Sequence, residues 1–221
     1  MKGTARFVAP AVAALAVGIS AHAAGAATVA LWNMDETSGS TMRDSVGSND
    51  GSLKNVALGK PGFRNNAYSF NGLSSIVTVP SSSALNPGSA AFSFTVHVKF
   101  SKVPPTDYDL LRKGRSSTSG GDYKLEILRR DSGTTGKASC HFDGSHASAT
   151  KTAGPDLANG SWHTITCKKR ASTITLVVDG VSYSKSVSVG SIANSAVLTV
   201  GAKSGGGDWY NGLMDEVSVS K

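Results

Sequence analysis

Carboxylates near the two ends of the chain are the first residues whose types suggest chemistry. Asp35 and Glu36 close the first predicted strand, and Asp215 and Glu216 lie in the last one. Calcium prefers about six to eight oxygen ligands, drawn from carboxylates and backbone carbonyls. Two interpretations of Asp35, Asp44 and Asp215 therefore stay open. They are calcium ligands, or they are strand-end and turn residues that accept hydrogen bonds from backbone amides.

Glycoside hydrolysis needs two carboxylates that flank the scissile bond, and the middle of the chain offers few. Glu126 is the one glutamate there, and Lys124 stands two positions before it in a predicted strand, which favours a solvated surface pair. Asp107 and Asp109 share one strand face beside a Pro-Pro loop, where an exposed strand start is expected. The sequence therefore predicts no catalytic residue. A glycan-cleaving enzyme is kept as the alternative to a binding protein.

Aromatic side chains outside the core matter for sugar binding, because the C–H face of a pyranose stacks on them. Trp209 is the strongest candidate, since the three glycines at 205–207 leave the chain before it free to move. Asp208 beside it can accept hydrogen bonds from sugar hydroxyls. Tyr108 and Tyr123 are further candidates. The alternative for all three aromatic residues is packing at the edge of the fold.

The elements that must position these residues are strands. Positions 92–100 alternate apolar and polar side chains, and so do positions 174–178, which Asp179-Gly180 follows as a two-residue hairpin turn. Glycine is frequent, with 25 of 221 residues, and charged residues are only 17 %. A chain of short amphipathic strands must pack them face to face, so we expect an all-β, two-sheet antiparallel sandwich. We expect these residues at or near its core: Cys140, Phe142, Trp162, Ile165 and Cys167.

The N-terminal segment predicts export. Lys2 and Arg6 precede an apolar run at 8–19, and small residues follow it. This order is typical of a secretory signal peptide, which we place at 1–26 with cleavage after Ala26. A membrane anchor is the alternative, but a spanning helix needs about 20 apolar residues. We therefore expect a secreted, extracellular protein without a transmembrane segment.

Export changes the interpretation of the two cysteines. Cys140 and Cys167 are the only cysteines in the chain. Two thiols in an oxidising compartment usually pair, so we predict a disulfide bond between them. Two buried free thiols are the alternative. A zinc site is less favoured, because the usual ligand spacing is absent.

The charge balance favours acidic or polar partners. The formal net charge is +7, and basic residues gather at 112–115, 129–130 and 168–170. If these clusters met on one rim, they would suit an acidic glycan or a cell-surface polymer, whereas a dispersed arrangement would serve solubility. A nucleic-acid partner is disfavoured, because the chain offers no reading helix and no aromatic ladder.

Several stretches together resemble the laminin-G-like, concanavalin-A-type jelly-roll domains, and the pentraxin-like branch is the nearest. They are residues 32–53, 70–80, 92–100, 160–183 and 209–220, in the order that the family shows. The resemblance implies a jelly roll over residues 27–221. It also implies that Asp215 matches the aspartate that holds a structural calcium in related domains. The family includes sugar-binding lectins, adhesion modules and glycan-cleaving enzymes, so the resemblance alone does not choose among them.

Our interpretation is a secreted, non-catalytic module that binds a carbohydrate or a cell-surface polymer. A protein-binding adhesion module is a further alternative.

If Asp215 holds calcium, EDTA should lower the melting temperature, and Asp215→Ala should remove that sensitivity. A ligand that binds only the native state stabilises it by about 2.7 kcal/mol at a hundredfold excess over Kd. Differential scanning fluorimetry with and without EDTA measures the shift. A melting curve that EDTA leaves unmoved would contradict calcium binding.

Overall fold

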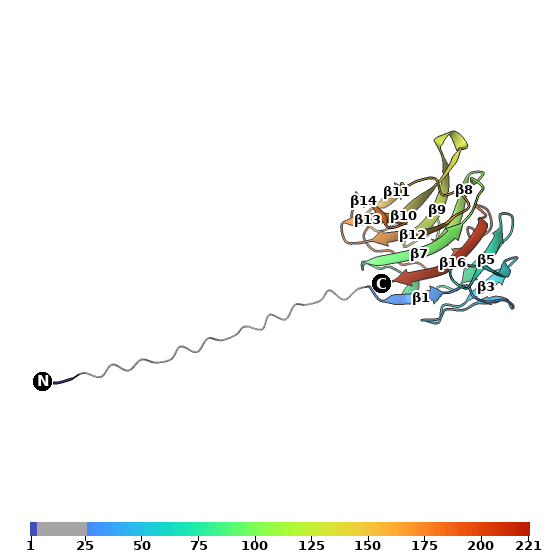
Figure 1. Ribbon diagram of the computed structural model, residues 1–221. Coiled ribbons are helices and arrows are strands. Elements are labelled where there is room, and N and C mark those ends of the chain that lie inside the picture. The colour runs from blue at the N-terminus through green and yellow to red at the C-terminus, as the bar shows by residue number, and fades with distance from the viewer. Residues whose placement is uncertain (4–25) are drawn as a thin grey trace.

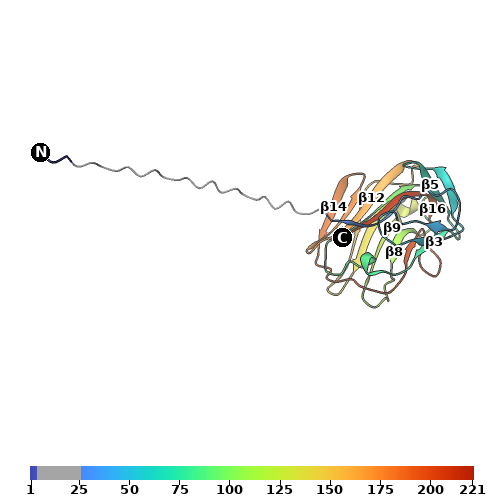
Figure 2. The same cartoon turned by 90° about the horizontal axis from the view of Figure 1, so that it is seen from below.

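A computed structural model gives the fold for residues 1–3 and 26–221. The predicted signal peptide at 1–26 lies almost wholly outside these described residues. The described chain forms two antiparallel sheets packed face to face, with two single-turn 3₁₀ helices at Ser83–Leu85 and Asp131–Gly133. Figure 2 shows the two sheets as stacked layers. The expected all-β jelly-roll sandwich is therefore confirmed. Among the described residues, no helix is long and apolar enough to cross a membrane.

The sheet that holds the first and last strands is called sheet A. Its strands, in spatial order, are β14 (Val181–Ser186), β13 (Thr173–Val178), β12 (Trp162–Lys169), β7 (Phe92–Lys99), β16 (Asn211–Ser220), β5 (Asn66–Asn71) and β4 (Ala57–Pro61). The first strand, β1 (Thr28–Trp32), also pairs with β16, so the two ends of the domain lie side by side (Figure 1).

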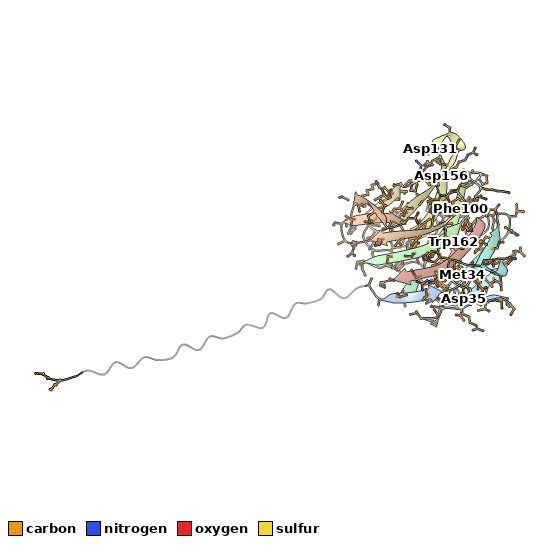
Figure 3. All side chains as sticks on the ribbon, in the orientation of Figure 1. Met34, Asp35, Phe100, Asp131, Asp156 and Trp162 are labelled. Carbon is orange, nitrogen blue, oxygen red and sulfur yellow. A yellow bond between two sulfur atoms is a disulfide. The ribbon has the colours of Figure 1, made fainter. Side chains whose placement is uncertain are left out.

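The second sheet is called sheet B. Its order is β11 (Ser148–Thr152), β10 (Thr135–Asp143), β9 (Asp122–Arg130), β8 (Asp107–Lys113), β15 (Leu198–Val200), β6 (Ile76–Val79), β3 (Gly51–Lys54) and β2 (Thr41–Met42). The β9–β10 hairpin, yellow in Figure 1, extends beyond the rest of the sheet, and Figure 3 labels Asp131 at its tip.

The apolar faces of the two sheets form one core. Along β7, buried apolar residues alternate with half-exposed polar ones, as the period-two pattern predicts, and the Asp179-Gly180 hairpin joins β13 to β14. Aromatic rings cross from sheet to sheet: the ring centroid of Tyr123 lies 5.1 Å from those of Phe92 and Phe94. Burying one such ring contributes roughly 1.5–3 kcal/mol to folding. The core therefore fixes which side of each strand faces solvent.

Trp162 departs from the expected core set. Ile165 and Cys167 are fully buried. Trp162 is an odd number of residues away from both on β12, so its side chain points to the other side of the strand, and its indole lies half-exposed on the outer face of sheet A. His163 instead points inward, and its ring bonds Asp179 Oδ2 at 2.7 Å and Asn159 Oδ1 at 3.0 Å.

Cys140 and Cys167 form the predicted disulfide. Cys140 belongs to β10 of sheet B and Cys167 to β12 of sheet A, and both are fully buried. Their Cα atoms lie 5.4 Å apart, within the range that a disulfide spans. The bond therefore joins the two sheets through the core.

Reduction of this bond should destabilise the fold by about 3.5 kcal/mol on the chain-entropy estimate for a loop of this length. Urea unfolding of the protein with and without a thiol reductant measures the difference. Intact mass after alkylation under denaturing, non-reducing conditions is the control, and two alkylated cysteines in the untreated protein would contradict the bond.

Candidate functional site

Charged side chains of both signs converge on the outer face of sheet B, where β8, β9 and β10 lie side by side. They line a hollow of about 330 Å³. Its lining residues are Arg112, Ser116, Asp122, Lys124, Glu126, His141 and Thr150. We call this the sheet-B hollow. Asp122, Lys124 and Glu126 come from β9 alone, because alternate residues of one strand point to the same face.

A β-bulge in β8 brings two more charges to this face. The pairing of β8 with β9 shifts register between Asp109 and Leu111, so Leu110 and Leu111 are both buried in the core. The extra residue re-aims the strand, so Asp109 and Arg112 can both lie on the outer face, although they are three positions apart. Arg112 Nη1 then donates to Asp109 Oδ2 at 2.7 Å.

The charges of the hollow are deeply buried for surface groups. Asp122 and Glu126 are 1 % and 3 % exposed, and Asp109, which lies behind the lining and pairs with Arg112, is 0 % exposed. Lys124 forms an ion pair with Glu126, and His141 Nε2 lies 3.5 Å from Asp122 Oδ1.

Not every polar atom here has a partner. In the described part of the chain, four buried side-chain atoms have no hydrogen-bond partner, and all four belong to adjacent strands of this sheet. They are Asp109 Oδ1, Arg112 Nε, Asp122 Oδ2 and Thr199 Oγ1. Native proteins rarely leave such atoms unpaired. The surplus hydrogen-bonding capacity therefore suits a polar ligand.

Burial sets the electrostatics of the hollow. It raises the pKa of Asp109 to about 7, although the nearby cations Arg112 and Lys124 act in the opposite direction. Burial also raises the pKa of Asp122 and lowers that of His141. Near neutral pH the buried Asp109 beside the hollow can therefore carry a proton, next to the cations Arg112 and Lys124.

The loop at 203–209 borders this site. Asp208 O accepts a hydrogen bond from Asp109 N at 2.9 Å, and the Asp208 carboxylate pairs with Lys203 Nζ at 2.9 Å. Burial acts to raise the pKa of Asp208, but its bonds to Lys203 and Asp107 outweigh burial and lower it. Trp209 is half-buried and lies against Gly206. Asp208 is therefore next to the hollow, and ligand contact by Asp208 and Trp209 stays a prediction.

Tyr108 and Tyr123 require a correction. Tyr108 is 3 % exposed and packs edge-on against Phe100 and Tyr210, while Tyr123 is fully buried and its hydroxyl donates to Leu85 O at 2.8 Å. Neither ring can stack on a sugar, because core side chains occupy their faces. The bulky rings fill the space between the sheets.

The carboxylates predicted as calcium ligands accept hydrogen bonds from the protein's own donors, Asp44 within its own loop and Asp35 and Asp215 at the turn between β4 and β5. The two oxygens of Asp44 accept five hydrogen bonds within the 29–49 region, four of them from backbone amides. Asp35 Oδ1 accepts from Asn66 N at 2.9 Å, and Asp215 Oδ2 accepts from Arg64 N at 2.8 Å. Among the described residues, no three His, Cys, Asp or Glu groups are placed to share a metal ion. As placed, Asp35, Asp44 and Asp215 do not form one calcium donor set, so calcium binding stays a prediction from the sequence.

Two lysines of the predicted basic clusters are buried. Lys113 is fully buried, and its ammonium group donates to Ser81, Asn194 and Ala196. Lys169 is 2 % exposed and donates to the carbonyl oxygens of Gly88 and Ala90. Both lysines hold loops, so they do not contribute to a cationic patch.

The central residues of the hollow were not expected from the sequence. Glu126 and Lys124 form the expected pair, but Glu126 is buried and Lys124 half-buried in the hollow rather than both being solvated. Asp109 is buried rather than at an exposed strand start. The alternation Asp122-Lys124-Glu126 was the available signal, since three charges on one strand face need a polar environment.

Asp109 should make stability depend on pH in a defined direction. Its pKa is about 7 when folded, against an ordinary value of 3.8. Between these values the native state binds more protons than the unfolded state, so rising pH lowers the free energy of unfolding, by up to about 1.4 kcal/mol per pH unit. Asp109→Asn should remove this contribution.

Urea unfolding of both proteins between pH 4 and pH 8 measures the difference in slope. Carboxyls that do not interact with Asp109 contribute equally to both proteins and cancel. Parallel pH profiles for the two proteins would contradict the raised pKa.

Comparisons with known proteins agree with this architecture. The model of the concanavalin A-like lectin/glucanases superfamily matches residues 70–221, and it leaves the resembling stretch at 32–53 outside. The search of curated proteins finds no match.

Solved structures with this fold include binding domains. The binding domain of Paraclostridial Mosquitocidal Protein 1 has a TM-score of 0.68 and 13 % identity, over 87 % of this chain and 48 % of its own. Domain 4 of a GH43 extracellular arabinanase from Geobacillus stearothermophilus, in complex with arabinotriose, has a TM-score of 0.62 and 15 % identity. The match covers 89 % of this chain and 93 % of that domain. The binding domain of Botulinum neurotoxin DC in complex with SialylT has a TM-score of 0.60 and 13 % identity. The match covers 87 % of this chain and 47 % of that one.

This chain thus spans about half the length of the first of these binding domains and nearly all of the arabinanase domain. At such identities the likeness concerns the fold. The match of the superfamily model over most of the chain, together with the two-sheet jelly roll, shows that the chain belongs to the concanavalin A-like lectin/glucanases superfamily.

Proposed function

We propose that this protein is a secreted carbohydrate-binding module whose ligand occupies the sheet-B hollow. The observation that carries the proposal is the set of buried polar atoms without a partner in and beside this hollow. A buried, unpaired donor or acceptor costs about 1–3 kcal/mol, and a ligand hydroxyl can satisfy it, since a hydroxyl both donates and accepts.

The charge pattern supports a sugar over an apolar ligand. Carboxylates accept hydrogen bonds from sugar hydroxyls, and Arg112 and Lys124 donate to them. The two signs alternate along β9, so a chain of sugar rings meets acceptors and donors in turn. The hollow lies on rigid strands rather than on loops, which preorganises these groups.

Relatives with this fold support the class of ligand. The arabinanase domain was solved with arabinotriose, and the Botulinum neurotoxin DC binding domain with SialylT. Export is supported by the N-terminal sequence and by the buried disulfide, since disulfides persist in oxidising compartments.

A glycan array with the wild-type protein, followed by calorimetry on the best ligand, tests the proposal. Glu126→Gln and Asp122→Asn should each weaken binding by about tenfold or more, because each removes a charge-assisted acceptor. The matched control is Asp131→Asn, a carboxylate at the exposed tip of the β9–β10 hairpin, outside the residues that line the hollow (Figure 3).

Equal binding by wild type and both hollow variants would overturn the proposal, and so would an array without any bound glycan. The control should bind like wild type. Melting temperatures of all variants establish that each is folded.

Glycan cleavage is the second candidate, and one observation favours it. Asp109 is directly opposite Glu126 on the neighbouring strand, and burial raises the pKa of Asp109 to about 7. A carboxyl that keeps its proton beside a second carboxylate is the arrangement that general-acid glycoside hydrolysis uses. Reducing-end release from a polysaccharide panel tests it. Release that Glu126→Gln abolishes would make this protein an enzyme, whereas binding without release supports the module.

A further inference from the structure

An aromatic cluster lies on the opposite side of the molecule, on the outer face of sheet A. The ring of Phe63 stacks on that of His97, with centroids 4.2 Å apart and planes 23° apart. The same ring meets Trp162 edge-on at 6.1 Å. Phe63 is 44 % exposed, although large apolar side chains are usually covered. We call these three residues the sheet-A platform; Figure 3 labels Trp162 over the middle of this sheet.

The chain holds Phe63 in place through backbone contacts. Phe63 belongs to the β4–β5 hairpin loop, where Gly62 N donates to Asn65 O at 3.1 Å. A side chain at Gly62 would collide with the carbonyl oxygens of Arg64 and Asn66, so the tight turn requires glycine.

Two carboxylates, the half-buried Asp35 and the fully buried Asp215, anchor the same loop. Asp35 accepts hydrogen bonds from Asn65 and Asn66, and Asp215 accepts from the backbone of Arg64. Phe63 is therefore an exposed ring on a fixed support, which offers a flat apolar surface at small entropic cost.

A hollow of about 280 Å³ lies beside this platform, and both apolar side chains such as Phe70 and Phe100 and polar ones line it. Its lining includes Ser69, Lys99, Lys102, Asn211 and Leu213. Lys99 connects the two features, because it lies opposite Trp162 on β12 and two residues from His97 on the same face of β7.

The charge around the platform is mainly positive. Within the described part of the chain, the ion pairs do not involve Arg64, Lys99 or Lys102. The nearby acidic residues are Asp215 and Glu216. Asp215 is fully buried and its two oxygens accept backbone amides, so it faces the loop rather than a ligand.

We infer that the sheet-A platform and this hollow form a second glycan site, which takes a carboxylate-bearing sugar of the uronic-acid type. The pyranose ring stacks on Phe63 and Trp162, and the carboxylate lies toward Lys99 and Lys102. This site is separate from the sheet-B hollow and lies on the other sheet. A protein with both sites can bridge two segments of polymer.

Calorimetry with α-1,4-linked trigalacturonate, compared with neutral α-1,4-galactotriose, tests the inference. The wild-type protein should bind the acidic trisaccharide at least about tenfold more tightly than the neutral one, and added salt should reduce the difference. Phe63→Ala should weaken binding of trigalacturonate by about tenfold. The double variant Lys99→Gln, Lys102→Gln should lose the preference for the acidic sugar.

Three controls separate the site from general effects. Val181→Ala removes another exposed apolar side chain of sheet A, 55 % exposed and at the far edge, and should bind like wild type. Phe63→Tyr keeps a ring and should retain binding. Glu126→Gln alters only the sheet-B hollow and should leave trigalacturonate binding unchanged.

The inference is overturned if Phe63→Ala binds trigalacturonate as tightly as wild type, or if the two trisaccharides bind equally. Loss of binding in Glu126→Gln would also overturn it, by placing the acidic sugar in the sheet-B hollow. Failure of this second site leaves the proposed function intact, because that proposal is tested by variants of the other sheet.

Discussion

The contact between the apolar faces of the two sheets is the interaction on which the molecule depends. Each large side chain that it buries contributes roughly 1.5–3 kcal/mol, whereas an exposed ion pair contributes about 1 kcal/mol or less. The core therefore decides which side of every strand faces outward. The disulfide between Cys140 and Cys167 crosses this same contact and joins sheet B to sheet A. Polar residues at alternate positions are left on two outer faces, where binding chemistry can develop.

The outer face of sheet B carries charges at a cost to stability. Asp109, Asp122 and Glu126 are nearly inaccessible to solvent. The free energy needed to remove their charges from water usually exceeds the favourable free energy of an ion pair. Hydrophobic residues of similar volume would often be neutral or stabilising there. Buried groups with shifted pKa values and unpaired atoms are typical of functional sites, where binding compensates for the lost stability.

The two outer faces differ in chemistry because different elements cover them. On sheet B, the β8 bulge and the loop at 203–209 enclose charges of both signs. On sheet A, the β4–β5 hairpin folds over β7 and presents a ring to solvent. Asp35 and Asp215, which the sequence suggested as calcium ligands, here hold the backbone of that hairpin. A carboxylate accepts from amides or binds a cation through the same oxygens, so only its neighbours decide between the two roles.

The sequence alone determined the strands, the class of fold and the disulfide. The period-two alternation is visible within each strand, and a chain with only two cysteines allows only one pairing within it. Only the tertiary structure decided where the functional groups meet. Asp109 lies opposite Glu126 and the bulge at Leu110 brings Arg112 to the same face, although the sequence suggested a solvated surface for both carboxylates. Phe63 and Trp162 are 99 positions apart and meet only because a hairpin folds across the sheet. Tyr108 and Tyr123 were candidates for sugar contact with packing as the alternative, and only the opposing sheet shows that both are buried.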